Sequence, residues 1–479
     1  MRRMPTHLVD RRAPHGRVGY SSRAKAGIDM RRVVINCCRI ICSALAVLTA
    51  LSTAIVQAAV ERPNIILVMA DDLGWGDVAY HGVDKTIQTP CLDEMSKAGI
   101  RFDRFYSQAA ICSPTRASCL TGRHPARYRM LLGTPLRTQE VTLAEVLHAV
   151  GYATGHFGKW HMGRVNERRG PHEHGFDEWF STPNNTIKID PDTYFHNGKA
   201  MGVIEGEDNQ IIMDRALSFI RQQTEAKKPL LAVIWFHTPH DPIGTTQEFL
   251  DLYDEKLGFR RKRYGEISAM DRQIGRLRIE LRTMKIADNT LLWFCSDNGW
   301  RTEGLRKGKT SLYEGGVKVA GILEWPARIR KPFQTDIPCC TIDFYPTILD
   351  LLGLKVENQP LLDGVSLVEL IDGKMIKRPR FLAFGATFSP HQCLVDGRFK
   401  LHILKDETVE LYNISADLGE SQNVADQHPE VVKQMHDHLK KWSASVEASV
   451  EKRDYVEGPL KVTAMDDLRI ERSSTAEPR

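Results

Sequence analysis

Unbroken apolar runs alternate with amphipathic stretches over most of the chain. Residues 65–69, 230–236 and 290–295 form runs of five to seven residues without a charged side chain. Such short continuous runs are typical of strands buried on both faces of a sheet. Residues 143–150 and 264–281 instead space their apolar side chains as one face of a helix. The alternation predicts an α/β fold.

The pattern changes after about Gly373. Four short candidate strands and an amphipathic stretch follow, at 380–388, 392–396, 399–404, 410–413 and about 429–442. They predict a small antiparallel sheet with a packed helix. We therefore divide the chain into a basic leader with a signal peptide (1–58), a main domain (59–373), an antiparallel subdomain (374–451) and a charged tail whose composition favours disorder (452–479).

Two further segments bear on a binding site. Residues 100–106 have strand character and lead towards Cys112, so we predict one strand there. Residues 181–209 show little periodicity. We expect them to form loops over a cleft, where they would set the choice of substrate.

Residues 1–58 have the composition of a targeting segment. They hold ten basic and two acidic side chains, a charge of +8, which leaves −3 for the rest of a chain whose total is +5. An apolar run over 40–56 follows Met30-Arg31-Arg32, and small residues end it at Ala58. We expect a signal peptide that is cleaved near Ala58, with export to the periplasm or the exterior. Two alternatives stay open: a retained anchor, although the run is shorter than the usual span of about 20 residues, and translation from Met30.

Charge and cysteine content narrow the classes of function. The mildly acidic remainder gives no indication of a nucleic-acid-binding surface, and membrane contact is expected only during export. Of ten cysteines, seven follow the leader. Their irregular spacing is not that of a disulfide-stapled scaffold, although one or two bridges stay open.

Acidic side chains follow two of the predicted strands. Asp71 and Asp72 come just after residues 65–69, and Asp297 and Asn298 just after residues 290–295. Open α/β sheets bind ligands at the carboxyl ends of their strands. Adjacent carboxylates repel each other unless a cation lies between them, and carboxylate and amide oxygens suit a hard divalent metal. Solvated turns are the alternative for each pair.

A cysteine motif follows the segment 100–106. Cys112, Pro114 and Arg116 lie in the sequence Cys-Ser-Pro-Thr-Arg. On its own, a cysteine is most often a small buried apolar residue. Proline suits the first turn of a helix, and Arg116 would lie about one helical turn from Cys112.

Basic and imidazole side chains follow the other predicted strands. Lys159 and His161 are two residues apart, so they face the same side of an extended segment. His240 lies in Pro-His-Asp-Pro after the run 230–236, with His237 as the alternative. Lys309 precedes the sequence Tyr-Glu-Gly-Gly. With the cysteine motif and the acidic pairs, these positions resemble the type I, formylglycine-dependent sulfatases, of the arylsulfatase or N-acetylgalactosamine-6-sulfatase kind, from about residue 62 to 442.

The resemblance implies a fold and two cofactors. The fold would be that of the alkaline-phosphatase-like superfamily, a large, mixed and mostly parallel sheet sandwiched by helices. A formylglycine-generating enzyme would oxidise Cys112 to an aldehyde, whose hydrate supplies an oxygen nucleophile. The metal would be Ca2+ rather than Mg2+, held by the hydrated residue 112 and by four further side chains, those of Asp71, Asp72, Asp297 and Asn298.

The resemblance also implies a role for each remaining side chain. Lys159 and Lys309 would neutralise the sulfate, and Arg116 would position the hydrated aldehyde. His240 would donate a proton to the departing alcohol. His161 would remove the proton of the second hydroxyl, so that sulfate leaves and the aldehyde returns.

The implied activity is hydrolysis of sulfate monoesters. Export favours a sulfated polysaccharide or its fragments as substrate, and aryl sulfates would also be cleaved. A phosphate or phosphonate ester hydrolase of the same superfamily is the first alternative, because it would share the metal site. A non-catalytic protein that binds sulfated glycans is the alternative from another class, and it requires Cys112 to stay unconverted. A structural or adhesion protein is expected to lack such a convergence of titratable groups.

Overall fold

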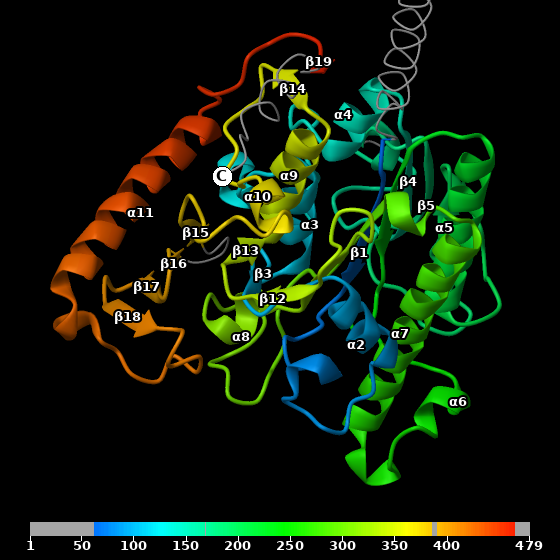
Figure 1. Ribbon diagram of the computed structural model, residues 1–479, viewed down its shortest axis with the longest axis horizontal. Helices are drawn as coiled ribbons and strands as arrows, with labels where there is room; N and C mark the ends of the chain where they lie inside the picture. Colours follow the sequence, from blue (N-terminus) through cyan, green and yellow to red (C-terminus); the bar gives the residue numbers. More distant parts are fainter. Residues whose placement is uncertain (1–61, 168, 386–389, 465–479) are drawn as a thin grey trace, which may run out of the picture. The chain divides into compact units, whose positions relative to one another are not determined.

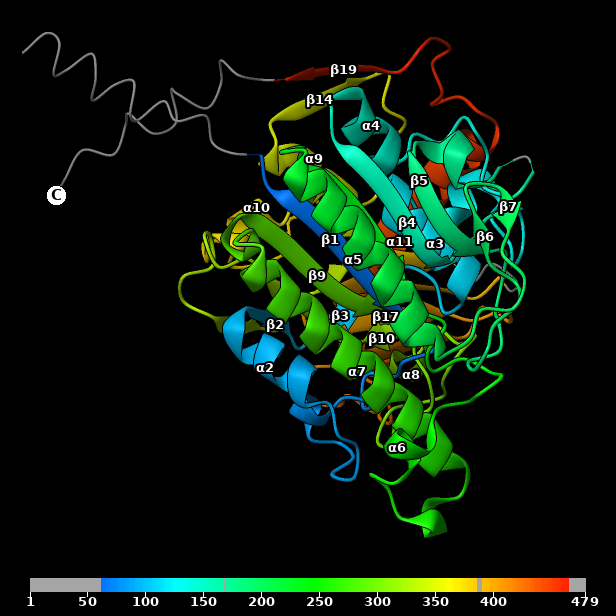
Figure 2. The ribbon, with the colours of Figure 1, turned by 90° about the vertical axis from the view of Figure 1, so that its right-hand side faces the viewer.

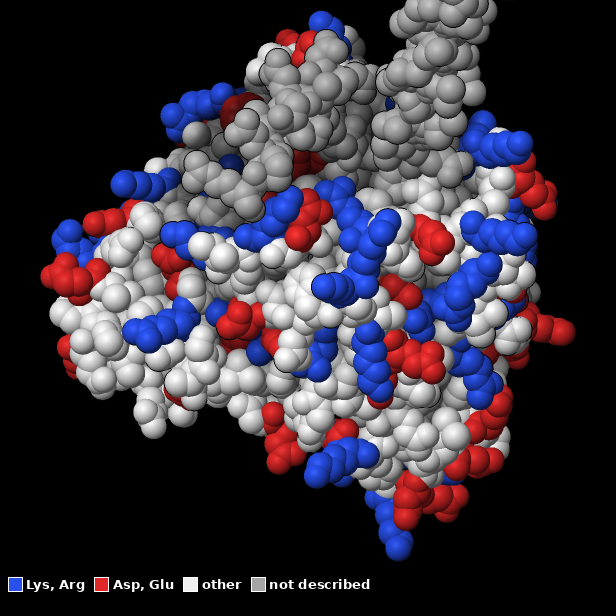
Figure 3. Space-filling model, in the orientation of Figure 1, with Lys and Arg blue, Asp and Glu red and all other residues white. Residues whose placement is uncertain are grey.

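The computed structural model describes residues 62–167, 169–385 and 390–464 (Figure 1). The predicted leader and signal peptide, with their three cysteines, lie outside the described residues, as do residues 465–479. Within the described part of the chain, no helix has the length and apolar character needed to cross a membrane. Basic and acidic side chains are interspersed over the face drawn in Figure 3.

A ten-stranded sheet forms the centre of the main domain. Five of its nine strand pairings are parallel, among them β1 with its two neighbours β8 and β9, and four are antiparallel. The prediction of a large, mixed and mostly parallel sheet is therefore confirmed. In order across the sheet the strands are β12 (Phe333–Thr335), β2 (Ile100–Phe102), β11 (Gly321–Glu324), β9 (Thr290–Ser296), β1 (Asn64–Ala70), β8 (Leu230–Trp235), β4 (Ala153–Lys159), β5 (Glu178–Thr182), β6 (Phe195–His196) and β7 (Lys199–Ala200).

Helices cover both faces of this sheet. Alternate residues of each strand point to opposite sides, so both faces carry apolar side chains that pack against helices. Ile66 and Val68 of β1 belong to a hydrophobic cluster with α2 (Pro90–Ala98), α5 (Asp208–Glu225) and α7 (Phe259–Thr283). Ile65 and Leu67 belong to a second cluster with α3 (Cys112–Thr121), α4 (Leu143–Ala149) and α9 (Phe344–Leu351). Figure 2 shows α5 and α7 crossing in front of the sheet. The apolar run of β1 is thus explained by burial on both faces.

The segment 100–106 differs from its prediction as one strand. It forms β2 in the central sheet and β3 (Phe105–Tyr106), which pairs with β10 (Lys318–Val319) and β13 (Cys339–Cys340) in a separate sheet. The polar residues Asp103 and Arg104 interrupt the apolar run and turn the chain between the two strands. Three short helices complete the domain, α6 (Gln247–Leu250), α8 (Glu314–Val317) and α10 (Val368–Ile371).

The carboxyl-terminal part contains the predicted antiparallel sheet and helix. The sheet is formed, in this order, by β15 (Leu382–Gly385), β16 (Gln392–Asp396), β17 (Phe399–Ile403) and β18 (Val409–Asn413). Helix α11 (Pro429–Val450) packs on it through Met435, Leu439 and Trp442. The helix continues beyond its predicted end at residue 442, because Val446 still packs against the same cluster.

Part of the predicted tail is ordered, which corrects the expectation of disorder for those residues. Strand β19 (Lys461–Ala464) pairs with β14 (Leu354–Glu357) in an antiparallel ladder. Upstream, Asp454 accepts a hydrogen bond of 2.7 Å from the buried Arg123. The charge composition of the tail did not indicate its partners β14 and Arg123, because both lie far from the tail in the sequence.

Candidate active site

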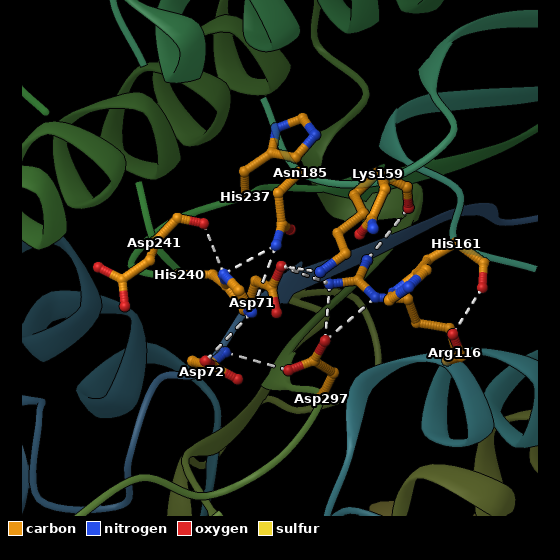
Figure 4. Close-up of polar contacts among 12 residues, drawn as sticks. Asp71, Asp72, Arg116, Lys159, His161, Asn185, His237, His240, Asp241 and Asp297 are labelled. Atoms are coloured by element: carbon orange, nitrogen blue, oxygen red, sulfur yellow. Dashed lines mark hydrogen bonds and ion pairs between the residues drawn. The ribbon is translucent and has the colours of Figure 1, made fainter. Parts of the chain in front are cut away.

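The acidic side chains meet at the carboxyl end of two adjacent strands. Ala70 at the end of β1 lies beside Ser296 at the end of β9, so the residues that follow both strands converge. The backbone N–H of Asp72 donates to Asp297 Oδ1 at 3.1 Å, and Asn298 Nδ2 donates to Asp72 Oδ1 at 2.8 Å. Figure 4 shows Asp71, Asp72 and Asp297 turned towards one another. The carboxyl edge of the sheet therefore carries three buried carboxylates.

Cys112 is the first residue of α3, and every residue of that helix is buried. Burial raises the pKa of its thiol to about 11, although Lys159 lowers it. The thiol is therefore protonated near neutral pH, which makes it a poor nucleophile. Its sulfur lies within 4.8 Å of carboxylate oxygens of Asp71 and Asp297.

Three cations accompany the three carboxylates. Arg116 on α3 contacts Asp297 through Nη2 at 2.7 Å and through Nε at 3.1 Å. Lys159, the last residue of β4, is paired with Asp71. Lys309 Nζ donates to a carboxylate oxygen of Asp72 at 2.7 Å.

The carboxylates differ in their protonation. Burial alone would raise the pKa of Asp71, but the charges of Lys159 and Arg116 outweigh it and hold the pKa well below its usual range. For Asp297, burial and the charge of Asp71 raise the pKa to about 7, against the effect of Arg116. The two carboxylates therefore repel each other, and further positive charge between them would stabilise both in the ionised form.

The donor atoms fit a hard divalent metal ion. Asp71 Oδ1 and Asn298 Oδ1 are buried without a hydrogen-bond partner among the described residues. Asp72 and Asp297 add carboxylate oxygens beside them. An all-oxygen set of this kind is what Ca2+ or Mg2+ requires, and unsatisfied buried oxygens are costly without such a partner. The site thus contains an acidic group that could hold a metal ion.

Two histidines flank this group. His161, two residues after β4, is only 8% exposed. Burial, reinforced by Lys159 and Arg116, lowers its pKa to about 2, so it is neutral. His240 is more accessible, with Nε2 3.6 Å from Asp72 Oδ2 and Nδ1 2.8 Å from Nδ2 of Asn185.

The alternative histidine, His237, has a different environment. It is fully buried, with Nδ1 2.9 Å from Asp208 Oδ2 and Nε2 2.7 Å from the Thr182 hydroxyl. In Figure 4 its ring points away from the carboxylates. His237 therefore links α5 to the sheet and does not face the site.

The structure adds side chains that the sequence pattern did not identify. Asn185 and Lys188 come from the segment 181–209, which was predicted only as loops. Lys188 Nζ donates to the carbonyl oxygens of His240 and Pro242, at 2.8 and 3.0 Å. Ser113 donates to the carbonyl oxygen of His161 at 2.8 Å. Irregular loops give no periodic signal, so their contacts could not be predicted.

All ten predicted site residues lie in this one region or contact it. The seven cysteines of the described residues are free thiols, with no bridge among them. A mixed sheet between helix layers, with an acidic group at its carboxyl edge that could hold a metal ion, is the arrangement expected from the resemblance to the alkaline-phosphatase-like hydrolases. The ten predicted site residues of this region are Asp71, Asp72, Cys112, Arg116, Lys159, His161, His240, Asp297, Asn298 and Lys309.

Comparisons with known proteins agree with this class. The sulfatase family model matches residues 63–354, and the model for the carboxyl-terminal part of N-sulphoglucosamine sulphohydrolase matches residues 307–445. N-acetylgalactosamine-6-sulfatase of Sus scrofa is 31% identical over 392 residues, which cover 72% of this chain and 73% of that protein. Arylsulfatase G of Rattus norvegicus is 29% identical over 65% of this chain and 69% of its own.

A solved structure has a similar fold. The crystal structure of Ps i-CgsB in complex with k-i-k-neocarrahexaose has a TM-score of 0.75 and 26% identity, and the match covers 82% of this chain and 97% of that one. The chain belongs to the sulfatase family. It is a sulfuric ester hydrolase, as the sequence motifs predicted.

Proposed function

We propose that the protein hydrolyses sulfate esters of saccharides with a formylglycine formed from Cys112 and a bound Ca2+. The observation that carries the proposal is the position of Cys112. It begins a buried helix, within 4.8 Å of two carboxylates that could hold the metal. The amino end of a helix also favours an anionic substrate.

Each cofactor would supply one kind of chemistry. Hydrated formylglycine supplies an oxygen nucleophile with a second hydroxyl, whereas a thiol would be trapped as a stable adduct with sulfur. A metal ion bound here would supply positive charge that favours an anionic substrate. Four side chains would hold it, those of Asp71, Asp72, Asp297 and Asn298, together with the converted residue 112.

The cations bind and orient the sulfate. Lys159 and Lys309 lie beside Asp71 and Asp72, where they can neutralise the charge that the metal leaves on the substrate. Arg116 lies on the same helix as residue 112, one turn further on, and Asp297 fixes its guanidinium. Arg116 therefore positions the nucleophile.

The two histidines move protons at opposite ends of the reaction. His240 is partly exposed, and its Nε2 faces the acidic group, so it can protonate the departing alcohol at the open side. His161 is buried on the other side of the cluster, where its imidazole would accept the proton of the second hydroxyl of residue 112. Asn185 holds the His240 ring at Nδ1.

The relatives support the proposed class of substrate. Those compared above include an N-acetylgalactosamine-6-sulfatase and a structure with a bound neocarrahexaose. A sulfated saccharide is therefore the substrate that we propose for this chain. Export through the signal peptide at residues 1–58, cleaved near Ala58, would bring the enzyme to such a substrate outside the cell, and a formylglycine-generating enzyme would act on Cys112 beforehand.

The rates of hydrolysis of a sulfate ester and of the corresponding phosphate ester test this function. Protein from the native host is expected to hydrolyse 4-nitrophenyl sulfate at least about 10²-fold faster than 4-nitrophenyl phosphate, and Cys112→Ala is expected to abolish both activities. Cys91→Ala is the matched control, since Cys91 lies on α2 outside the site. A preference for the phosphate ester would support the phosphoryl hydrolase instead. Full activity of the Cys112→Ala variant would overturn the proposal.

A further inference from the structure

A hollow of about 350 Å3 opens beside the active site. Its walls are Trp300, Arg301 and residues 307–311, which include Lys309. The volume lies within the range of about 300–1,000 Å3 that is usual for small-molecule sites. Because Lys309 is paired with Asp72, the hollow begins where the sulfate is proposed to bind.

The cations of this region fall into two groups. Arg306 is held by Tyr412 and Glu410 and stacks on Tyr313, and Lys309 is held by Asp72. The side chains of Arg301 and Lys307 are exposed, and neither has a hydrogen bond or an ion pair with any described residue. Two unpaired cations beside a catalytic site leave room for anionic partners.

The walls of the hollow are held in place by the site itself. The backbone N–H of Thr310 donates to the carbonyl oxygen of Ala110 at 2.8 Å, close to Cys112. Lys307 and Thr310 have φ values of 63° and 72°, a left-handed backbone that non-glycine residues adopt mainly at constrained positions. The loop of Lys309, which lines the hollow, is therefore tied to the segment that precedes Cys112.

Trp300 gives the hollow an aromatic wall. The guanidinium of Arg263 lies 4.8 Å from the centre of its ring and donates to the carbonyl oxygen of Asp72. Arg263 is 4% exposed. Its guanidinium therefore covers one part of the Trp300 indole and links that side chain to the backbone of Asp72. An aromatic surface next to cations suits a sugar ring that carries anionic substituents.

We propose that this hollow binds a second anionic group of the substrate, on a sugar next to the one that loses its sulfate. Arg301 and Lys307 would bind that group, a sulfate or a carboxylate, by charge-assisted hydrogen bonds. The substrate is then a polyanionic oligosaccharide and not a singly sulfated monosaccharide. This inference rests on the proposed function and specifies its substrate.

Binding measurements on the full-length Cys112→Ala chain test the inference without turnover. Isothermal titration calorimetry gives the Kd of N-acetylgalactosamine 6-sulfate, which has one anionic group, and of two longer probes. Chondroitin 6-sulfate tetrasaccharide carries sulfates and carboxylates, and neocarrahexaose carries sulfates only. In this parent chain, the ratio of the monosaccharide Kd to the oligosaccharide Kd is expected to exceed about 30. Arg301→Ala or Lys307→Ala is expected to lower this ratio about tenfold, which corresponds to about 1.4 kcal/mol of binding free energy. A fall for neocarrahexaose assigns the second group as sulfate, and a fall for the tetrasaccharide alone assigns it as carboxylate.

The control removes the same charges elsewhere. Arg330 and Lys331 are exposed between β11 and β12, and their double substitution by alanine is expected to leave the ratio unchanged. A ratio near 1 in the parent, or one that Arg301→Ala and Lys307→Ala do not change, would overturn the inference. Failure of the proposed function appears separately, as absent turnover of 4-nitrophenyl sulfate by the unsubstituted enzyme.

Discussion

At the scale of single residues, the site balances three carboxylates against three cations. The pairs are Asp71 with Lys159, Asp72 with Lys309, and Asp297 with Arg116. A divalent ion among the carboxylates would replace part of this pairing and free the two lysines for sulfate. Under the proposed function, these residues would then bind the metal and the substrate in one cluster.

The proposed role of His240 as proton donor is tested by comparing two substrates with different leaving groups. In His240→Ala, kcat/KM for a saccharide sulfate is expected to fall about 10²–10⁴-fold, because an alkoxide needs a proton to depart. With 4-nitrophenyl sulfate the loss is expected to be about tenfold or less, because nitrophenolate leaves without one. His148→Ala is the control, since His148 is exposed and paired with Asp177. Equal losses on both substrates would contradict the role as proton donor.

The acidic residues could be predicted because each follows a recognisable buried strand. Asp71 and Asp297 directly follow β1 and β9, and parallel pairing brings the ends of these two neighbouring strands together. The motif around Cys112 was recognisable for a different reason, because its residues are continuous in the sequence. Asn185 and Lys188 reach the site from an irregular loop, where no local pattern fixes the direction of a side chain.

At the scale of elements, a buried ion cluster joins the carboxyl-terminal sheet to the main domain. Lys400 on β17 lies 2.8 Å from Glu314 on α8 and 3.2 Å from Glu420. Burial would lower the pKa of Lys400, but the two carboxylates hold it above its usual range. Helix α8 follows the loop of Lys309, so the cluster fixes one end of that loop.

Removal of Lys400 is therefore expected to affect the whole fold. Lys400→Ala leaves two buried carboxylates without their cation, and the free energy of unfolding is expected to fall by about 3–5 kcal/mol. Urea denaturation measures the loss. Lys405→Ala is the control, because Lys405 is exposed at the turn after β17 and should change stability by about 0.5 kcal/mol or less. Equal stability of the two variants would show that the cluster does not support the fold.

Element types were predictable from hydrophobic periodicity, whereas their boundaries and long-range partners were less so. The apolar run of β1 and the helical spacing of α7 both appear in the structure. Residues 100–106 split into two strands that pair in different sheets, and this was not predicted because the partners β11 and β13 come from much later in the chain. For the same reason the pairing of β19 with β14 could not be predicted.

At the scale of the whole molecule, the proposed metal would contribute to stability as well as to chemistry. Chelation by EDTA is expected to abolish sulfatase activity and to lower Tm, because an ion at 100 times its Kd stabilises the native state by about 2.7 kcal/mol. Added Ca2+ should restore both quantities. The Asp297→Asn variant is expected to lose this dependence on Ca2+. If EDTA changes neither the Tm nor the activity of the enzyme, the proposal of a metal site is wrong.

The most direct test of the central claim is the mass of the tryptic peptide that carries residue 112, from protein made in the native host. Replacement of the thiol by an aldehyde is the predicted result, and the hydrate would appear as the same peptide plus one water. The matched peptide with Cys91 should keep its thiol. An unmodified Cys112 in folded protein that hydrolyses sulfate esters would contradict the account.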